Sequence, residues 1–164
     1  MKSTSEKVAL VIAILIIILV ISGIVGGVFL VKKLMYKDSI TGEKFVSVME
    51  DNSFYVVDIK ERLDDSYFAI NEAYVAKKDE YQVEFYTFKN DEAANYFYET
   101  NKKKNDSNTV NTKIDFKGEN YAVFNIETKT KYKFLEIIDK AVIYINADKE
   151  YKDSVKDIVK KLGY

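Results

Sequence analysis

The distribution of apolar and polar positions divides the chain into two unlike parts. Residues 8–31 form a run of 24 residues without a charge, in which Ser22 is the only side chain with a hydroxyl. A helix rises about 1.5 Å per residue, so this run would extend about 36 Å and cross a hydrocarbon core of roughly 30 Å. The pattern predicts a tail at residues 1–7, a transmembrane helix at 8–31, a juxtamembrane linker at 32–39 and a domain at 40–164.

A cleaved secretory signal peptide is the alternative explanation of the apolar run. Such a peptide has an apolar region of ~7–15 residues that ends at a small-x-small cleavage site. The run here is longer and continues through Phe29 into Lys32 and Lys33 without such a site. We therefore expect a retained single-pass anchor, with the lipid bilayer as a partner.

The orientation of this helix is not decided by its flanking lysines. Lys2 and Lys7 precede it and Lys32, Lys33 and Lys37 follow it, so the positive-inside rule gives nearly equal weight to both sides. A short tail before a larger exported domain is the usual layout of bacterial membrane proteins of this kind. We expect a cell-membrane protein whose C-terminal domain lies outside the cytoplasm.

Small residues recur at a spacing of four within the predicted helix. Gly23 and Gly27 form a G-x-x-x-G pair, and Ser22 and Gly26 form a second small-residue pair. This spacing lets two helix backbones approach closely in lipid, which favours a homodimer through the membrane helix. The alternative is that glycine is simply common in such helices.

Three segments of the domain have the 3.6-residue period of a helix. Thr41 is suited to cap a first helix, with Phe45, Val48 and Met49 on one face. Asn90 is suited to cap a second, followed by a polar loop at residues 102–111. We place Ala93, Ala94, Phe97 and Asn101 on its inner face and Tyr98 away from it. A third helix starts at Asp148, ends at Gly163 and carries the stripe Tyr151, Val155, Ile158, Val159 and Leu162.

Seven segments alternate apolar and polar residues and are predicted strands. They are residues 54–59, 68–77, 81–88, 112–116, 121–128, 131–138 and 141–146. Short connections make neighbouring strands antiparallel. The expected fold is α+β, with a mainly antiparallel sheet of about seven strands and three helices in the order α-βββ-α-ββββ-α. Two hairpin–helix units at an offset of about 60 residues suggest an internal repeat.

Several short sequences carry a resemblance to other proteins. They are residues 40–45 (ITGEKF), residues 81–88 (YQVEFYTF) before Asn90, residues 151–152 (YK) and residues 161–164 (KLGY). Over most of its length the chain resembles small, N-terminally membrane-anchored α+β proteins of low-GC Gram-positive bacteria. The resemblance implies an anchor and an α+β domain, and no activity that could be carried over.

Composition excludes several kinds of chemistry. The chain has no Cys, His, Pro or Trp, so thiol and imidazole catalysis and thiolate or imidazole metal sites are excluded. Glycine-rich phosphate loops do not occur, and we expect no cofactor. The domain from Leu34 on has 21 basic and 25 acidic residues, with Arg62 as its only arginine. A net charge near −4 argues against nucleic acid as a partner, because nucleic-acid binding needs a clustered basic face.

Carboxylates and tyrosines remain as candidate chemistry. Glu84 and Glu136 are expected on solvated sheet faces, and Asp64, Asp65 and Ser66 are expected in a turn. The six surplus tyrosines form an exposed aromatic platform or belong to a sheet covered by helices on both faces. They are Tyr74, Tyr86, Tyr96, Tyr98, Tyr132 and Tyr144.

Two classes of function stay open. The first is a non-enzymatic binding or structural module at the cell envelope, acting on a peptide, a cell-wall polymer or a neighbouring membrane protein. The second is an envelope hydrolase or transferase that uses carboxylates and tyrosines, such as Glu84 with Tyr86. An enzyme needs titratable groups that converge in a pocket, whereas a binding module needs only an exposed surface.

Overall fold

The computed structural model describes residues 36–63, 69–79, 81–106 and 110–164. The chain divides into the units Met1–Tyr36 and Lys37–Tyr164, and the second contains the whole domain. The predicted membrane helix, with Ser22, Gly23, Gly26 and Gly27, lies outside the described residues, as does the turn at residues 64–66. Within the described ranges, no helix combines the length and the apolar character that crossing a bilayer requires.

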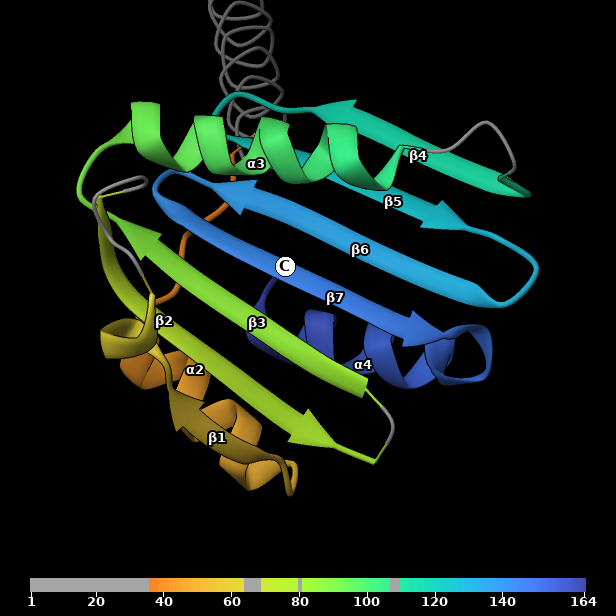
Figure 1. Cartoon of the computed structure of the whole chain (residues 1–164), viewed down its shortest axis with the longest axis horizontal. Coiled ribbons are helices and arrows are strands. Elements are labelled where there is room, and N and C mark those ends of the chain that lie inside the picture. The colour runs from red at the N-terminus through yellow and green to blue at the C-terminus, as the bar shows by residue number, and fades with distance from the viewer. Residues whose placement is uncertain (1–35, 64–68, 80, 107–109) are drawn as a thin grey trace, which may run out of the picture. The chain divides into compact units, whose positions relative to one another are not determined.

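The domain is built on one antiparallel sheet of seven strands (Figure 1). The strands are β1 (Tyr55–Asp58), β2 (Ile70–Lys78), β3 (Tyr81–Phe88), β4 (Thr112–Lys117), β5 (Tyr121–Glu127), β6 (Lys131–Ile138) and β7 (Ala141–Asp148). Their order across the sheet is β1-β2-β3-β7-β6-β5-β4, so β1 and β4 form its two edges. The α+β class and the predicted strands are confirmed, with strand ends shifted by at most two residues.

Three helices complete the domain: α2 (Gly42–Asp51), α3 (Asp91–Asn105) and α4 (Lys152–Leu162). The predicted N-caps form, since Thr41 Oγ1 accepts from the Lys44 N–H at 3.2 Å and Asn90 Oδ1 accepts from the Ala93 N–H at 2.8 Å. Gly163 ends α4 in the left-handed conformation, with φ of 90°. Short 3₁₀ turns occupy Lys60–Arg62 and Lys149–Tyr151.

The sheet has a hydrophobic core on each face. On one side, here called the α2/α4 face, α2 and α4 cover a core that includes Phe45, Phe85 and Ile143. On the opposite side, the α3 face, α3 covers a core that includes Phe124 and Leu135. Figure 1 shows α3 in front of the sheet and α2 and α4 behind it. The two predicted hairpin–helix units therefore send their helices to opposite faces, so they do not superpose as repeats.

The predicted inner face of α3 is partly wrong. Ala94 is buried as expected, but Tyr98 is 2 % exposed, whereas Phe97 and Asn101 are half-buried. The helix continues through Lys102, Lys103 and Lys104 to Asn105, so the predicted loop begins later than residue 102. Lysine is a good helix former and is favoured at a helix C-terminus, which explains why the helix includes the lysine run.

The start of α4 also differs from the prediction. β7 continues to Asp148, a 3₁₀ turn follows, and α4 begins only at Lys152. Tyr151 therefore lies in the turn, where its ring packs 5.3 Å from that of Tyr81. The remaining predicted stripe is buried as expected and consists of Val155, Ile158, Val159 and Leu162.

Candidate interaction site

On the α3 face, helix α3 covers only part of β3 and β7. Tyr86 is buried beneath α3, whereas Glu84 and its cross-strand neighbour Tyr144 are half-buried. Two residues before Glu84 on β3, Gln82 lies opposite Asn146 of β7, which is exposed. The sheet itself, rather than a loop, thus presents these side chains to solvent.

Glu84 is held by two neighbours on its own strand. The Tyr86 hydroxyl donates to Glu84 Oε2 at 2.7 Å, and Gln82 Nε2 donates to Oε1 at 2.7 Å. Burial foremost, and then the adjacent carboxylate, raise the pKa of Tyr86 far above 10, so the phenol keeps its proton. The structure thus brings together the predicted pair Glu84 and Tyr86.

These residues border a shallow hollow of about 380 Å³, which we call the Glu84 hollow. It is lined by Lys77, Asp79, Tyr81, Gln82, Glu84, Tyr144 and Asn146. At its α3 side, Asn105 Oδ1 accepts from the Tyr144 hydroxyl at 3.2 Å and from Lys133 Nζ at 2.9 Å. The last turn of α3 therefore orients the Tyr144 ring at the rim of the hollow.

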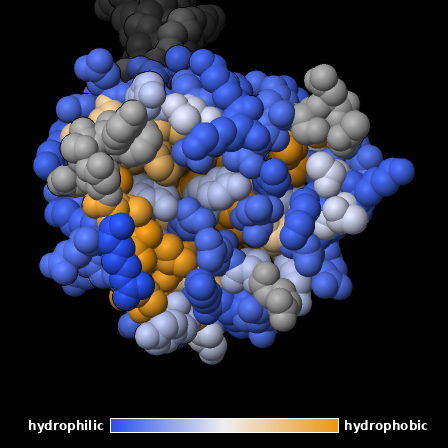
Figure 2. Space-filling model, in the orientation of Figure 1, coloured by the Kyte–Doolittle hydropathy of each residue, from blue (hydrophilic) through white to orange (hydrophobic). Residues whose placement is uncertain are grey.

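An apolar strip lies on the same face of the molecule. Figure 2 shows hydrophobic residues gathered along β2, with hydrophilic residues around them. Val57 of β1 pairs with Val75 of β2, which in turn pairs with Glu84, and both valines are half-buried. The Glu84 hollow and this strip form one continuous surface of mixed polarity.

Glu136 lies on the opposite face of the sheet. Along β6 it alternates with Leu135, which belongs to the α3-face core, and it pairs with Ile143 of the α2/α4-face core. Glu136 is 1 % exposed, so the prediction of a solvated residue is wrong. Burial raises the pKa of Glu136 and the Lys37 ammonium opposes that shift. The two predicted carboxylates are therefore separated by the sheet.

Lys37 connects the start of the domain to this buried acid. Its Nζ lies 2.6 Å from Glu136 Oε1 and 4.8 Å from the centre of the Tyr121 ring. The Lys37 N–H donates to Asn120 Oδ1 at 3.0 Å, and Asn120 Nδ2 donates back to the Lys37 carbonyl at 2.7 Å. The chain thus enters the domain clamped to the β4–β5 turn. Sequence patterns gave no signal for this contact, because these residues lie far apart in the chain.

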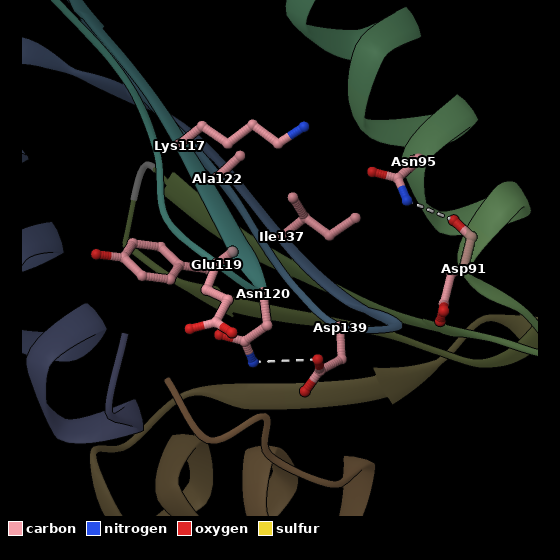
Figure 3. A pocket seen from close by; sticks show the side chains of 9 residues that line it. Asp91, Asn95, Lys117, Glu119, Asn120, Ala122, Ile137 and Asp139 are labelled. Carbon is pink, nitrogen blue, oxygen red and sulfur yellow. Dashed lines mark hydrogen bonds between the residues drawn. The ribbon is translucent and has the colours of Figure 1, made fainter. Parts of the chain in front are cut away.

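A second cavity of about 320 Å³ lies beside this clamp (Figure 3). Ala122 and Ile137 contribute apolar surface, and Lys117, Glu119, Asp91 and Asp139 contribute charges. Figure 3 shows Asn120 directed toward Asp139, to which its amide donates at 3.1 Å, while Asp91 and Asn95 project from α3. The acids here are spread over three elements and surround no common point.

The surplus tyrosines do not form one platform. Tyr86, Tyr98 and Tyr132 are buried, Tyr74 and Tyr144 are half-buried, and Tyr96 is 55 % exposed. Tyr74 and Tyr132 belong to the α2/α4 face, whereas Tyr86, Tyr98 and Tyr144 belong to the α3 face. Helices on both faces account for all of them except Tyr96. Of the six, only Tyr144 lines the Glu84 hollow, where Tyr81 is a further lining residue.

Two further findings bear on the chemistry of the site. In the part of the chain that the structure describes, no three acidic side chains are close enough to hold a metal ion. Comparison with known proteins finds no protein-family model, no curated protein and no solved structure that matches the chain.

Proposed function

We propose that this chain is a single-pass membrane protein whose domain is a non-enzymatic binding or structural module at the cell envelope. The apolar run at residues 8–31 and the short linker after it would hold the domain close to the bilayer. The contact surface is the Glu84 hollow with its apolar strip. Its partner is a peptide, a cell-wall polymer or a neighbouring membrane protein.

The observation that carries the proposal is the separation of Glu84 from Glu136. Paired-carboxylate catalysis needs two acids in one cleft, roughly 5–10 Å apart, on either side of the bond that is cleaved. Glu84 and Glu136 face opposite sides of the sheet. Tyr86 donates a hydrogen bond to Glu84, and Lys37 forms an ion pair with Glu136. This arrangement supports binding over catalysis by the Glu84–Glu136 pair; Asp79, the other acid that lines the hollow, belongs to the β2–β3 turn.

The composition of the hollow suits recognition of an extended polar chain. Gln82, Asn146 and Lys77 offer amide and ammonium groups, and the Tyr144 ring offers an amphipathic face. A shallow surface with several hydrogen-bonding groups can accept a linear ligand without enclosing it. Such a ligand could place apolar groups on the strip of Val57 and Val75.

An envelope hydrolase or transferase is the second candidate. The 2.7 Å hydrogen bond between Tyr86 and Glu84 favours it, since a carboxylate held by a phenol can act as a general base. In that mechanism Glu84 would take a proton from a nucleophile bound in the hollow. Replacement of Glu84 by Gln would then abolish turnover while leaving the shape of the hollow intact.

Site-specific photocrosslinking in intact cells tests the proposal. A photoreactive residue at Asn146 samples the hollow, and one at Lys156, which is exposed on α4, samples the other face. We expect discrete adducts from position 146 and not from position 156, and we expect Tyr144→Ala to remove them. Equal adducts from both positions, or none from position 146, would show that the hollow is not the contact surface.

A further inference from the structure

Among the residues that the structure describes, strand β4 is an open edge of the sheet. It pairs with β5 on one side, and all six of its residues are exposed. Ile114 and Phe116 are 50 % and 47 % exposed, which is high for large apolar side chains. An edge strand of this kind presents unpaired backbone groups and apolar side chains, and natural proteins usually cover such edges.

The register of the β4–β5 hairpin determines which backbone groups point outward. The Gly118 N–H donates to the Tyr121 carbonyl at 2.8 Å, so this pair is a hydrogen-bonded pair. Hydrogen-bonded and non-hydrogen-bonded pairs alternate along an antiparallel ladder. The even-numbered residues of β4 therefore bond to β5, and Lys113, Asp115 and Lys117 direct their N–H and C=O groups to the open edge.

The two faces of β4 differ in character. Lys113 and Asp115 lie on the α3 face, where Lys113 pairs with Asp106 at 2.8 Å and Asp115 pairs with Lys102 at 2.6 Å. Ile114 and Phe116 lie on the α2/α4 face, opposite Asn125 and Val123. Charges of both signs thus alternate along one face, and apolar groups occupy the other.

We infer that β4 pairs antiparallel with β4 of a second copy of this chain, around a twofold axis at Ile114. A twofold axis perpendicular to the sheet keeps each face of the sheet continuous across the two copies. Side chains alternate between faces along a strand, so an odd-numbered residue can oppose only an odd-numbered one, and an even-numbered residue only an even-numbered one. Among such axes, those at Ile114 and at Asp115 pair the most of β4, five of its six residues each. At Asp115, the carboxylate would face its own copy and Lys113 would face Lys117, which puts like charges opposite each other.

With the axis at Ile114, charge and hydrogen bonding agree. Lys113 lies opposite Asp115 of the second copy, and the twofold axis generates this pair a second time. Both residues direct their backbone groups outward, so each pair forms two N–H to C=O hydrogen bonds, four in all. On each side of the axis, Lys102, Asp115, Lys113 of the second copy and its Asp106 form a row of alternating charge. Ile114 meets its own copy, and Phe116 lies opposite Thr112. The pairing does not involve the Glu84 hollow, so the two proposals can fail separately.

Disulfide crosslinking of the full chain in membranes tests this register, because the chain has no cysteine of its own. Non-hydrogen-bonded pairs have Cα atoms about 4.5 Å apart, within the range of a disulfide. We expect I114C to crosslink with itself under mild oxidation. T112C and F116C should each crosslink poorly alone and at least about tenfold faster when the two variants are mixed.

Two controls make the result decisive. Tyr55, 73 % exposed on the opposite edge strand β1, reports random collisions through Y55C. D115C reports the other possible axis. Crosslinking of I114C no faster than that of Y55C overturns the pairing, and preferential crosslinking of D115C overturns the register. All five positions are exposed, so the substitutions leave the core intact.

Discussion

Glu136 and Lys37 form a buried ion pair, with 2.6 Å between Oε1 and Nζ, although 99 residues separate them in the sequence. Glu136 lies in the middle of β6 on the α2/α4 face, and Lys37 is the first residue of the domain. The Tyr164 hydroxyl is also buried; burial foremost, and then the Glu136 carboxylate, raise the pKa of Tyr164. The pair therefore fastens the segment that enters the domain to β6, an interior strand of the sheet.

Removal of Lys37 should destabilise the domain. Lys37→Met keeps the length of the side chain but leaves the Glu136 carboxylate buried without its countercharge. Loss of one partner of a buried pair costs about 3–5 kcal/mol, and we expect about 2–4 kcal/mol because the Lys37 side chain is 29 % exposed. Urea unfolding of the full chain in mild detergent, followed by the near-UV circular dichroism of its tyrosines, measures the change.

The pH dependence of the stability lost in Lys37→Met distinguishes the lost ion pair from lost packing contacts of the Lys37 side chain. Lys37 lowers the pKa of Glu136, so its removal raises a pKa that burial already holds above 4.5. Because the pKa of Glu136 is higher in the folded state than in the unfolded state, this residue favours folding below about pH 4.5. The contribution disappears as the pH rises through the pKa of the folded state. The deficit of Lys37→Met should therefore grow from pH 4.5 to pH 8, and Glu136→Gln in the same chain should remove the growth. A deficit that does not change with pH would contradict the ionic account.

The Glu127 carboxylate should contribute to stability at high pH, whereas the raised pKa of Glu136 contributes at low pH. Hydrogen bonds from Lys149, at 2.7 Å, and from Lys152 lower the pKa of Glu127 to about 2. A lowered pKa stabilises the folded state above 4.5, and this stabilisation is lost as the pH falls toward 2. Thermal melts should show Glu127→Gln to be less stable than the native chain at pH 7, with the two converging near pH 2. Parallel pH profiles would show that the lysines do not act on this carboxylate.

Tyr98 anchors α3 to the sheet. It is 2 % exposed, and its hydroxyl has no hydrogen-bond partner among the residues that the structure describes. Tyr98→Ala should cost about 3–5 kcal/mol, as for other large buried aromatics. Phe97→Ala should cost less, because Phe97 is half-buried and contacts Tyr86 and Phe88 from the rim of the core.

A conservative variant sharpens this comparison. Tyr98→Phe removes only the buried hydroxyl, so the free energy of unfolding should stay within about 1 kcal/mol of the native value or rise. All three variants can be compared by urea unfolding. A larger loss for Phe97→Ala than for Tyr98→Ala would restore the helix orientation predicted from the sequence.

The fold could be predicted where its signals are local. The alternation in β3 and β6 gave their bounds, and the caps at Thr41 and Asn90 gave the starts of two helices. The orientation of α3 could not be predicted with the same certainty, because Phe97 and Tyr98 are adjacent aromatics and the rest of the helix is polar.

The candidate site could be predicted only in part. Glu84 and Tyr86 are two positions apart on one strand and therefore share a face. The burial of Glu136 could not be predicted, because it depends on Lys37, a residue distant in sequence. The strand order, which leaves β4 at an edge, and the register, which turns the two acids to opposite faces, follow from long-range pairing that no local pattern encodes.

Fractionation of cells tests the proposed membrane anchor. We expect the full chain to stay with membranes through washes with high salt and alkaline carbonate, since about 24 apolar residues insert stably. A soluble protein that lacks about 30 N-terminal residues would indicate a cleaved signal peptide instead. Protease added to intact protoplasts should digest the domain, and a domain protected until lysis would invert the proposed orientation.

Binding without chemical turnover is the central claim, and one measurement tests it most directly. The purified full chain is incubated with fragments of the cell envelope, and mass spectrometry then determines both what is retained and whether it is chemically altered. We predict that material is retained unchanged by the native chain and by Glu84→Gln, and that Tyr144→Ala loses it. Conversion of the material to new products by the native chain, abolished in Glu84→Gln, would contradict the account and establish an enzyme.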